Sequence, residues 1–449
     1  MDSLQSIEKK KNALETKLRY CQEKIRRIKT AIQTDELDFA GIFRSKEEER
    51  YFQYLLKLKK NELNSQEYEQ EKIRAQLKRL QQQQEQINKE EKLKYEKRID
   101  ELYQQIIQSL KNGQLIFFLG PDINLCDRPI AEDGRPDKWN LGSQYPPTDF
   151  EIAELLANKY KTYLENSISE ESICPKCSSR LIQDLPDKCP LKNLQSVSQY
   201  IYDVFGEYNL YSELHQVFGS KDRHYNPNRV HQNLAEISKF FSQELKTNNK
   251  NHPLIVSTIY DWTLEQELVR KGQKFDLISY IDKGIEHGRY QHHLPCMTYP
   301  PEGDGETILS QSYRNPINDK QHKLLEKYPT NLKLCNGVFT EDQVDQLIFE
   351  RVSDMLPDCL INKLSDNNIL FLGYSLNNKK ARTILKLFCP DRQYQNTKWW
   401  TVQESFAEED KKNWNLKIYQ AQLITMSPSD FIVELNQRLR DNSKLEVLS

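Results

Sequence analysis

Apolar side chains recur at alternating spacings of three and four residues along the start of the chain. Such spacing is the a/d seam of a heptad repeat, which packs long helices against one another. Lys11 interrupts the first seam, and residues 33–47 separate it from a second. The first seam comprises Leu4, Ile7, Leu14, Leu18, Cys21, Ile25, Ile28 and Ile32, and the second comprises Leu56, Leu63, Ile73, Leu77, Leu80 and Ile87. The pattern predicts two long helices, either folded back as an antiparallel hairpin or continued as one extended rod.

After residue 112 the pattern changes. Short apolar runs without charge, typical of strands buried on both faces, alternate with segments of helical spacing. The strand-like runs lie at 114–119, 254–258, 331–334, 368–372 and 399–402, and the helical segments lie at 152–160, 194–218, 263–270, 381–388 and 429–440. Strands that alternate with helices predict an α/β fold with a parallel, doubly wound sheet.

Composition changes at the same point. All 18 prolines, and all but one of the 14 glycines, follow residue 112. We therefore predict an all-α coiled-coil or helical-hairpin stalk over residues 1–112 and an α/β domain over residues 113–449, with a helical insertion at about 160–250. Such a stalk joins copies of the chain into a homo-oligomer or binds a partner protein, unless its helices pack only within one chain.

Charge and cysteine content bear on the binding partners and the cellular compartment of the protein. The net charge is −2 and no basic patch is interleaved with aromatic residues, so nucleic-acid binding is not expected. The first residues lack the apolar core of a secretory signal, and no apolar run reaches the ~20 residues that span a bilayer. Nine cysteines, an odd number, suit a reducing compartment better than a disulfide framework. We expect a soluble cytoplasmic protein.

Two of the predicted strands end in glycine-containing turns that lead toward helices, at Gly120 and Gly373. In an open α/β sheet such turns lie at the carboxyl edge, where backbone N–H groups can bind phosphates. A tight turn from strand to helix also requires glycine for backbone reasons alone. The sequence leaves both interpretations open for each turn.

The order of these motifs resembles the sirtuin-like domains of prokaryotic antiviral-defence proteins, many of which hydrolyse NAD⁺. The resemblance extends over residues 113–437 and implies a Rossmann-like fold with a helical insertion. The segments that carry it are Phe118–Asn124 with Arg128-Pro129, Gln195–Tyr200, Leu210–Leu214, Val230–Ala235 and, as the most specific match, Phe371–Leu376.

The resemblance also implies a ligand of the NAD or ADP-ribose type. In this family the turn matched by Phe371–Leu376 faces the ribose and adenine side of NAD. The residues that the resemblance assigns to cofactor binding are Gly120, Pro121, Asp122, Asn124, Arg128, Thr258, Asp261, Gly373, Tyr374 and Ser375.

Two positions depart from the family's catalytic pattern. Ile259 stands where the family has the asparagine that holds the nicotinamide ribose and the attacking water, and Cys335 stands where it has the catalytic histidine. Isoleucine has no donor or acceptor, and a neutral thiol is a poor base. Because a positioned base contributes roughly 10²- to 10⁴-fold in rate, we expect catalytic degeneration, unless His231 or His252 supplies a base from elsewhere.

Three cysteines resemble half of a zinc knuckle. Cys174 and Cys177 form a Cys-Pro-Lys-Cys motif, and Cys189 follows twelve residues later. A structural zinc site takes four ligands, and His215 or His224 could complete the set. The alternative is a proline-rich loop with unpaired thiols, so a structural zinc ion remains one of two interpretations.

These features leave three functions open. In the preferred one, the protein binds an NAD- or ADP-ribose-type nucleotide without hydrolysing it and serves as a sensing, regulatory or assembly subunit, as in antiviral defence. In the second, it is an active NAD⁺ glycohydrolase that depletes NAD⁺ as a defence effector. In the third, the nucleotide site is vestigial and the protein is a scaffold. A protein deacylase is least favoured, because both the histidine and a full zinc module are missing.

Overall fold

The computed structural model divides the chain into two compact units, Met1–Leu102 and Tyr103–Ser449. None of the helices among the described residues is both long and apolar enough to cross a bilayer. The residues that the structure describes are 4–38, 45–132, 134–160, 193–218, 225–244, 253–273, 275–285, 288–293, 330–333, 358–376, 379–388, 397–416 and 419–448.

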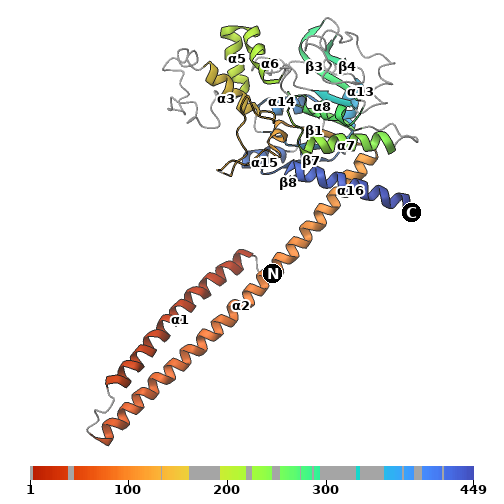
Figure 1. Cartoon of the computed structure of the whole chain (residues 1–449). Coiled ribbons are helices and arrows are strands. Elements are labelled where there is room, and N and C mark those ends of the chain that lie inside the picture. Colours follow the sequence, from red (N-terminus) through yellow and green to blue (C-terminus); the bar gives the residue numbers. More distant parts are fainter. Residues whose placement is uncertain are drawn as a thin grey trace. The chain divides into compact units, whose positions relative to one another are not determined.

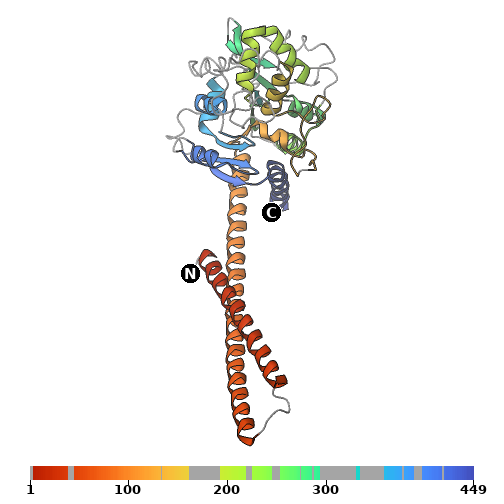
Figure 2. The same cartoon turned by 90° about the vertical axis from the view of Figure 1, so that its left-hand side faces the viewer.

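The first unit is a helical hairpin made of α1 (Leu4–Asp38) and α2 (Lys46–Lys111), of which α2 runs on into the second unit. The two helices lie side by side in Figures 1 and 2. An apolar cluster joins them, and antiparallel ion pairs flank it. The cluster comprises Ile28, Ile32, Phe52, Leu56 and Leu63, and the ion pairs are Lys24–Glu62, Lys29–Glu67, Asp35–Lys59 and Glu36–Lys60. The chain therefore folds back on itself. A coiled coil between chains stays a prediction.

The second unit is built on one eight-stranded sheet with the order β4-β3-β5-β2-β1-β6-β7-β8. All neighbouring strands pair in parallel except β3 and β4, which form an antiparallel hairpin. The strands are β1 (Leu115–Leu119), β2 (Leu254–Ser257), β3 (Asp276–Ile285), β4 (Gly288–His293), β5 (Thr330–Lys333), β6 (Asn368–Leu372), β7 (Trp399–Gln403) and β8 (Gln422–Thr425). The predicted parallel sheet is confirmed, and β3, β4 and β8 are additions to it.

Helices cover both faces of this sheet. Phe117 and Phe118 point to opposite faces of β1, and neither is exposed to solvent. A predicted helix over 194–218 is divided in two at Gly206, whose φ of +88° ends the first part. The helices of this unit are α3 (Asp149–Lys159), α5 (Leu194–Phe205), α6 (Glu207–Phe218), α7 (Arg229–Glu244), α8 (Thr263–Arg270), α13 (Asp358–Asp366), α14 (Lys379–Phe388), α15 (Glu408–Trp414) and α16 (Pro428–Leu448), with a 3₁₀ helix, η1 (Pro121–Leu125), after β1.

The turns that follow β1 and β6 touch through their backbones. β1 and β6 are neighbours in the sheet, so Gly120 and Gly373 lie next to each other. A Cβ atom on Gly120 would overlap the carbonyl oxygen of Gly373, and one on Gly373 would lie 2.6 Å from the backbone nitrogen of Ile123. Gly373 also has a φ of +58°, which disfavours other residues. Both glycines are therefore required by the close approach of the two turns.

We predict that Gly373→Ala destabilises the α/β unit far more than Gly272→Ala. Both glycines have positive φ, at +58° and +69°, but a Cβ atom at Gly272 meets nothing within 4 Å. The difference isolates the steric clash, which should cost about 1–3 kcal/mol or more. Urea denaturation followed by circular dichroism measures it. Equal losses in the two variants would show that the turns can move apart.

Candidate functional site

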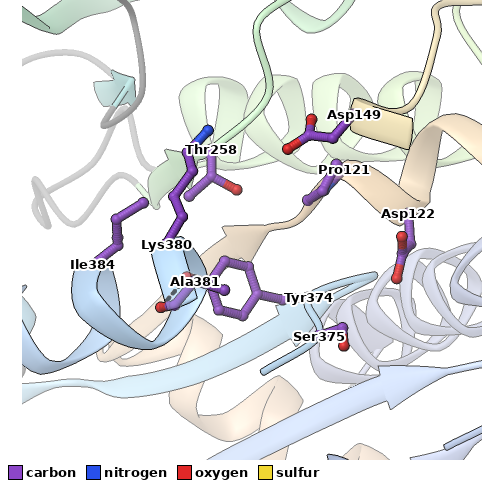
Figure 3. A pocket seen from close by; sticks show the side chains of 9 residues that line it. All are labelled: Pro121, Asp122, Asp149, Thr258, Tyr374, Ser375, Lys380, Ala381 and Ile384. Atoms are coloured by element: carbon purple, nitrogen blue, oxygen red, sulfur yellow. Dashed lines mark hydrogen bonds between the residues drawn. The ribbon is translucent and has the colours of Figure 1, made fainter. Parts of the chain in front are cut away.

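A cavity of about 60 Å³ opens at the carboxyl edge of the sheet, where β1, β2 and β6 end. Ligands of open α/β sheets bind at this edge. The volume has room for a few water-sized groups, well below the ~300–1,000 Å³ of a site that encloses a whole small molecule. Figure 3 shows the lining side chains, which are Pro121, Asp122, Asp149, Thr258, Tyr374, Ser375, Lys380, Ala381 and Ile384.

The structure brings half of the ten predicted cofactor-binding residues to this cavity. They come from both glycine turns and from the end of β2. Gly120 and Gly373 lie in the turns themselves and are not among the lining residues. Asn124, Arg128 and Asp261 are not part of the cavity wall. The residues at the wall are Pro121, Asp122, Thr258, Tyr374 and Ser375.

Backbone N–H groups of the first turn donate within the protein. The Gly120 N–H donates to the Leu372 carbonyl at 2.9 Å, and the Asp122 N–H donates to the Gly373 carbonyl at 3.2 Å. At the end of β2, both the N–H and the hydroxyl of Thr258 donate to the Leu119 carbonyl, at 3.1 and 3.0 Å. These donors join the strand ends to one another. For the first turn, the structure supports the backbone interpretation of the glycine rather than the phosphate one.

The second turn is held by side chains from β7 and α15. The Leu376 N–H donates to Asp410 at 2.8 Å, and the Gln403 amide donates to the Tyr374 carbonyl at 2.7 Å. The Tyr374 hydroxyl donates to the Ala381 carbonyl at 2.8 Å, which joins the turn to the start of α14. Tyr374 therefore contributes its ring to the cavity wall, while its hydroxyl is engaged elsewhere.

Asn124 and Asp261 form a buried pair beside the cavity. The Asn124 amide donates to the Asp261 carboxylate at 2.9 Å and to the Pro147 carbonyl at 3.1 Å. The other oxygen of Asp261 accepts from the Thr263 N–H at 3.0 Å, at the first residue of α8. The pair connects η1 with the start of α8, so the structure gives it a positioning role.

Arg128 is committed to the loop between η1 and α3. Its five N–H groups make five hydrogen bonds: two to the carboxylate of Glu151, at 2.6 and 2.9 Å, and three to the carbonyls of Asn124, Asp137 and Pro146. A guanidinium has five such donors and no more. The Arg128 side chain is 1% exposed. It has no donor left for a phosphate and instead fixes the loop.

The predicted catalytic and metal-binding residues that the structure describes lie at separate places in the fold. Ile259 is buried at the end of β2, and its N–H donates to the Ser257 hydroxyl at 3.2 Å. His231 is buried in α7 and does not line the cavity. No group of metal-ligating side chains occurs among the described residues, where His215 is exposed on α6. The predicted positions outside the described residues are Cys335, His252, Cys174, Cys177, Cys189 and His224.

Charged side chains that the sequence analysis did not assign to the site define the chemistry of the cavity. Lys380 is 5% exposed; its ammonium group donates to the Tyr260 hydroxyl and lies 4.2 Å from the centre of the Tyr260 ring. Burial, with help from the nearby Asp149 and Asp410 carboxylates, raises the pKa of Asp122 from 3.8 to about 7. Burial also raises the pKa of Asp149, and the Lys380 ammonium acts against that rise.

One feature of the sequence could have pointed to Lys380. It lies in the first turn of α14, where the helix dipole disfavours a positive charge. A cation placed there needs a compensating contact, which Tyr260 supplies from the end of a distant strand. Asp149 follows the N-cap Thr148, so its position alone is typical of a helix start.

We predict that Arg128→Met lowers the free energy of unfolding by about 3–5 kcal/mol, because it leaves the Glu151 carboxylate buried without its partner. Lys411→Met is the control, since the Lys411 side chain is 44% exposed and its ion-pair partner Glu408 is 81% exposed. The control should lose less than about 1 kcal/mol. Chemical denaturation measures both variants, and a loss at Arg128 no larger than that of the control would contradict the assigned role.

We also predict a pH dependence that Asp122→Asn removes. The carboxyl ionises near 3.8 when unfolded and near 7 when folded, so the folded state holds the extra proton between these values. Stability from this group is therefore lost as pH rises from about 4 to about 7. Denaturation across this range should show a smaller decline for Asp122→Asn than for the wild type.

Asp127→Asn is a control, because the Asp127 carboxyl should contribute to stability with the opposite pH dependence. Burial acts to raise the pKa of Asp127, but hydrogen bonds from Arg229 and Ser429 lower it overall. Its contribution is present above the unfolded pKa and is lost as pH falls. If Asp122→Asn has the same pH profile as the wild type, the carboxyl is not desolvated as described.

Comparison with protein families matches residues 253–424 to the SIR2-like domain. The match runs from β2 into β8 and includes Thr258, Ile259, the second glycine turn and Lys380. A search of curated proteins found no match. The segment from β2 into β8, which lies on a parallel, Rossmann-like α/β sheet, is thus similar to the SIR2-like domain, and this similarity suggests an NAD-related function.

Proposed function

We propose that the α/β unit binds a nucleotide of the NAD or ADP-ribose type at the carboxyl edge of its sheet and does not hydrolyse it. The observation that carries the proposal is the cavity at this edge, within reach of the SIR2-like segment and lined from both glycine turns and the end of β2. Its volume of about 60 Å³ holds one part of such a nucleotide, and the rest lies outside it.

The residue that follows Thr258 at the end of β2 supports the proposed absence of hydrolysis. Splitting the glycosidic bond requires water to be positioned and a base within hydrogen-bond reach. Ile259, the residue after Thr258, is buried and apolar and can do neither. Among the described residues that line the cavity, none is a histidine. The remaining candidate base is the Asp122 carboxyl, whose pKa of about 7 lets it accept a proton near neutrality.

A role as a sensing, regulatory or assembly subunit, as in antiviral defence, would use the helical hairpin. Four large side chains at positions i, i+3, i+4 and i+7 form an exposed stripe on α2, away from the cluster that packs on α1. They are Tyr51, Tyr54, Leu55 and Leu58. Such spacing presents one helix face, which suits a second copy of the chain or a partner protein.

We predict that full-length protein is stabilised by ADP-ribose and by NAD⁺ and releases no nicotinamide from NAD⁺. Ligand at 100 times its dissociation constant adds ~2.7 kcal/mol to stability, which raises the midpoint of thermal unfolding. Differential scanning fluorimetry measures the shift, and chromatography measures nicotinamide. Ile259→Asn combined with Cys335→His should gain hydrolysis if the site is otherwise intact.

Two results would overturn the proposal. If neither nucleotide shifts the midpoint, the protein is a scaffold without nucleotide binding. If the wild type releases nicotinamide, it is an NAD⁺ glycohydrolase, and Asp122→Asn then tests whether the carboxyl is its base.

A further inference from the structure

The cavity contains an ammonium group with donors that the described residues do not use. Lys380 reaches into it from the first turn of α14, and the Tyr260 hydroxyl is its hydrogen-bond partner among the described residues. An ammonium group has three donors, so the described residues leave two of them for another acceptor. A charge buried to this degree is costly when its donors are not all used. The position of Lys380 therefore favours a ligand that brings acceptor atoms.

The same space contains an acceptor to which none of the described residues donates. Within the described part of the chain, the Asp149 carboxylate has no hydrogen-bond or ion-pair partner, and neither has that of Asp122. Lys380 is close enough to affect the pKa of Asp149, yet the two groups form no ion pair within 4.0 Å. Figure 3 shows Lys380 and Asp149 extending from different elements to line the cavity, which Thr258 also lines. A bridging ligand would use both groups at once.

The charges select the kind of group that can bridge them. A phosphate would satisfy Lys380 but would have to share the space with Asp149, which repels it when ionised and must first take up a proton in order to donate to it. The N–H groups of Gly120 and Asp122, which could have balanced this repulsion, already donate to backbone carbonyls. A vicinal diol is neutral: one oxygen accepts from Lys380 while a hydroxyl donates to Asp149. Two hydroxyls also fit the small volume.

We propose that Lys380 and Asp149 form a clamp for the vicinal hydroxyls of a ribose, so that the cavity takes a sugar of the nucleotide and leaves its phosphates outside. The inference rests on the proposed nucleotide binding and adds which part of the ligand enters. It makes Lys380 and Asp149 specificity-determining residues of the site.

The test is isothermal titration of full-length protein with ADP-ribose, comparing wild type with Asp149→Asn and Lys380→Met. Hydrogen bonds to charged groups predict an affinity about 10- to 100-fold weaker in each variant. Lys386→Met is the matched control, because Lys386 is exposed on the same helix, and its affinity should equal that of the wild type. Inorganic pyrophosphate should bind the variants no more weakly than the wild type.

Two further ligands identify which ribose enters. If it is the terminal ribose of ADP-ribose, ADP binds the wild type at least tenfold more weakly than ADP-ribose does. The variants then bind ADP with the same affinity as the wild type. If it is the adenosine ribose, 2′-deoxy-ADP binds the wild type at least tenfold more weakly than ADP does. The comparisons of ADP with ADP-ribose and of 2′-deoxy-ADP with ADP on the wild type need no variant, so they test ribose recognition even if a variant fails to fold.

The failures are distinguishable. If the wild type binds ADP-ribose but both variants bind it within twofold of the wild type, the clamp is wrong and the proposed function stands. The clamp is equally wrong if the variants lose pyrophosphate and ADP-ribose to the same extent, since the site would then recognise phosphate. If the wild type binds neither ADP-ribose nor NAD⁺, the proposed function fails and the clamp fails with it.

Discussion

Direct contact between the backbones of two strand ends is the constraint on which the candidate site depends. β1 and β6 are neighbours, and the turns after them approach so closely that neither Gly120 nor Gly373 has room for a Cβ atom. Asp122 and Ser375, each two residues after one of these glycines, consequently line the same cavity. The rigid carboxyl edge of the sheet thus fixes polar side chains from segments about 250 residues apart in the sequence.

The buried polar groups around this edge are of two kinds. Arg128 and Glu151 use their hydrogen-bonding capacity within the protein, and they hold the loop that borders the site. Asp122, Asp149 and Lys380 keep capacity that the described residues do not use. Incompletely satisfied charges are costly, and functional sites are where proteins retain them. The groups whose hydrogen bonds are all made within the protein hold the surrounding loop in place, and the others are available to interact with a ligand.

Much of the fold follows from the sequence, for a physical reason. β1, β2, β6 and β7 are buried on both faces, so they are uncharged apolar runs that stand out in the sequence. β8 is half exposed at the sheet edge, and β3 with β4 carries polar residues, so no such run marks them. The site is less predictable because its chemistry comes from distant partners. In the sequence alone, Lys380 cannot be told from a solvent-exposed lysine, because its contact with Tyr260 exists only in the fold. Arg128 likewise resembles a phosphate ligand, because its five acceptors come together only in the fold.

The five hydrogen bonds of Arg128 also have a kinetic consequence. One side chain ties together carbonyls at both ends of the segment between η1 and α3 and the first turn of α3 itself. Such a segment loosens less readily residue by residue, because one guanidinium holds acceptors at both of its ends. The loop and the start of α3 should therefore open and close as one cooperative unit, with amide protons exchanging at a common, slow rate. Asp149, the first residue of α3, lines the cavity, so its place in the wall depends on the same set of hydrogen bonds.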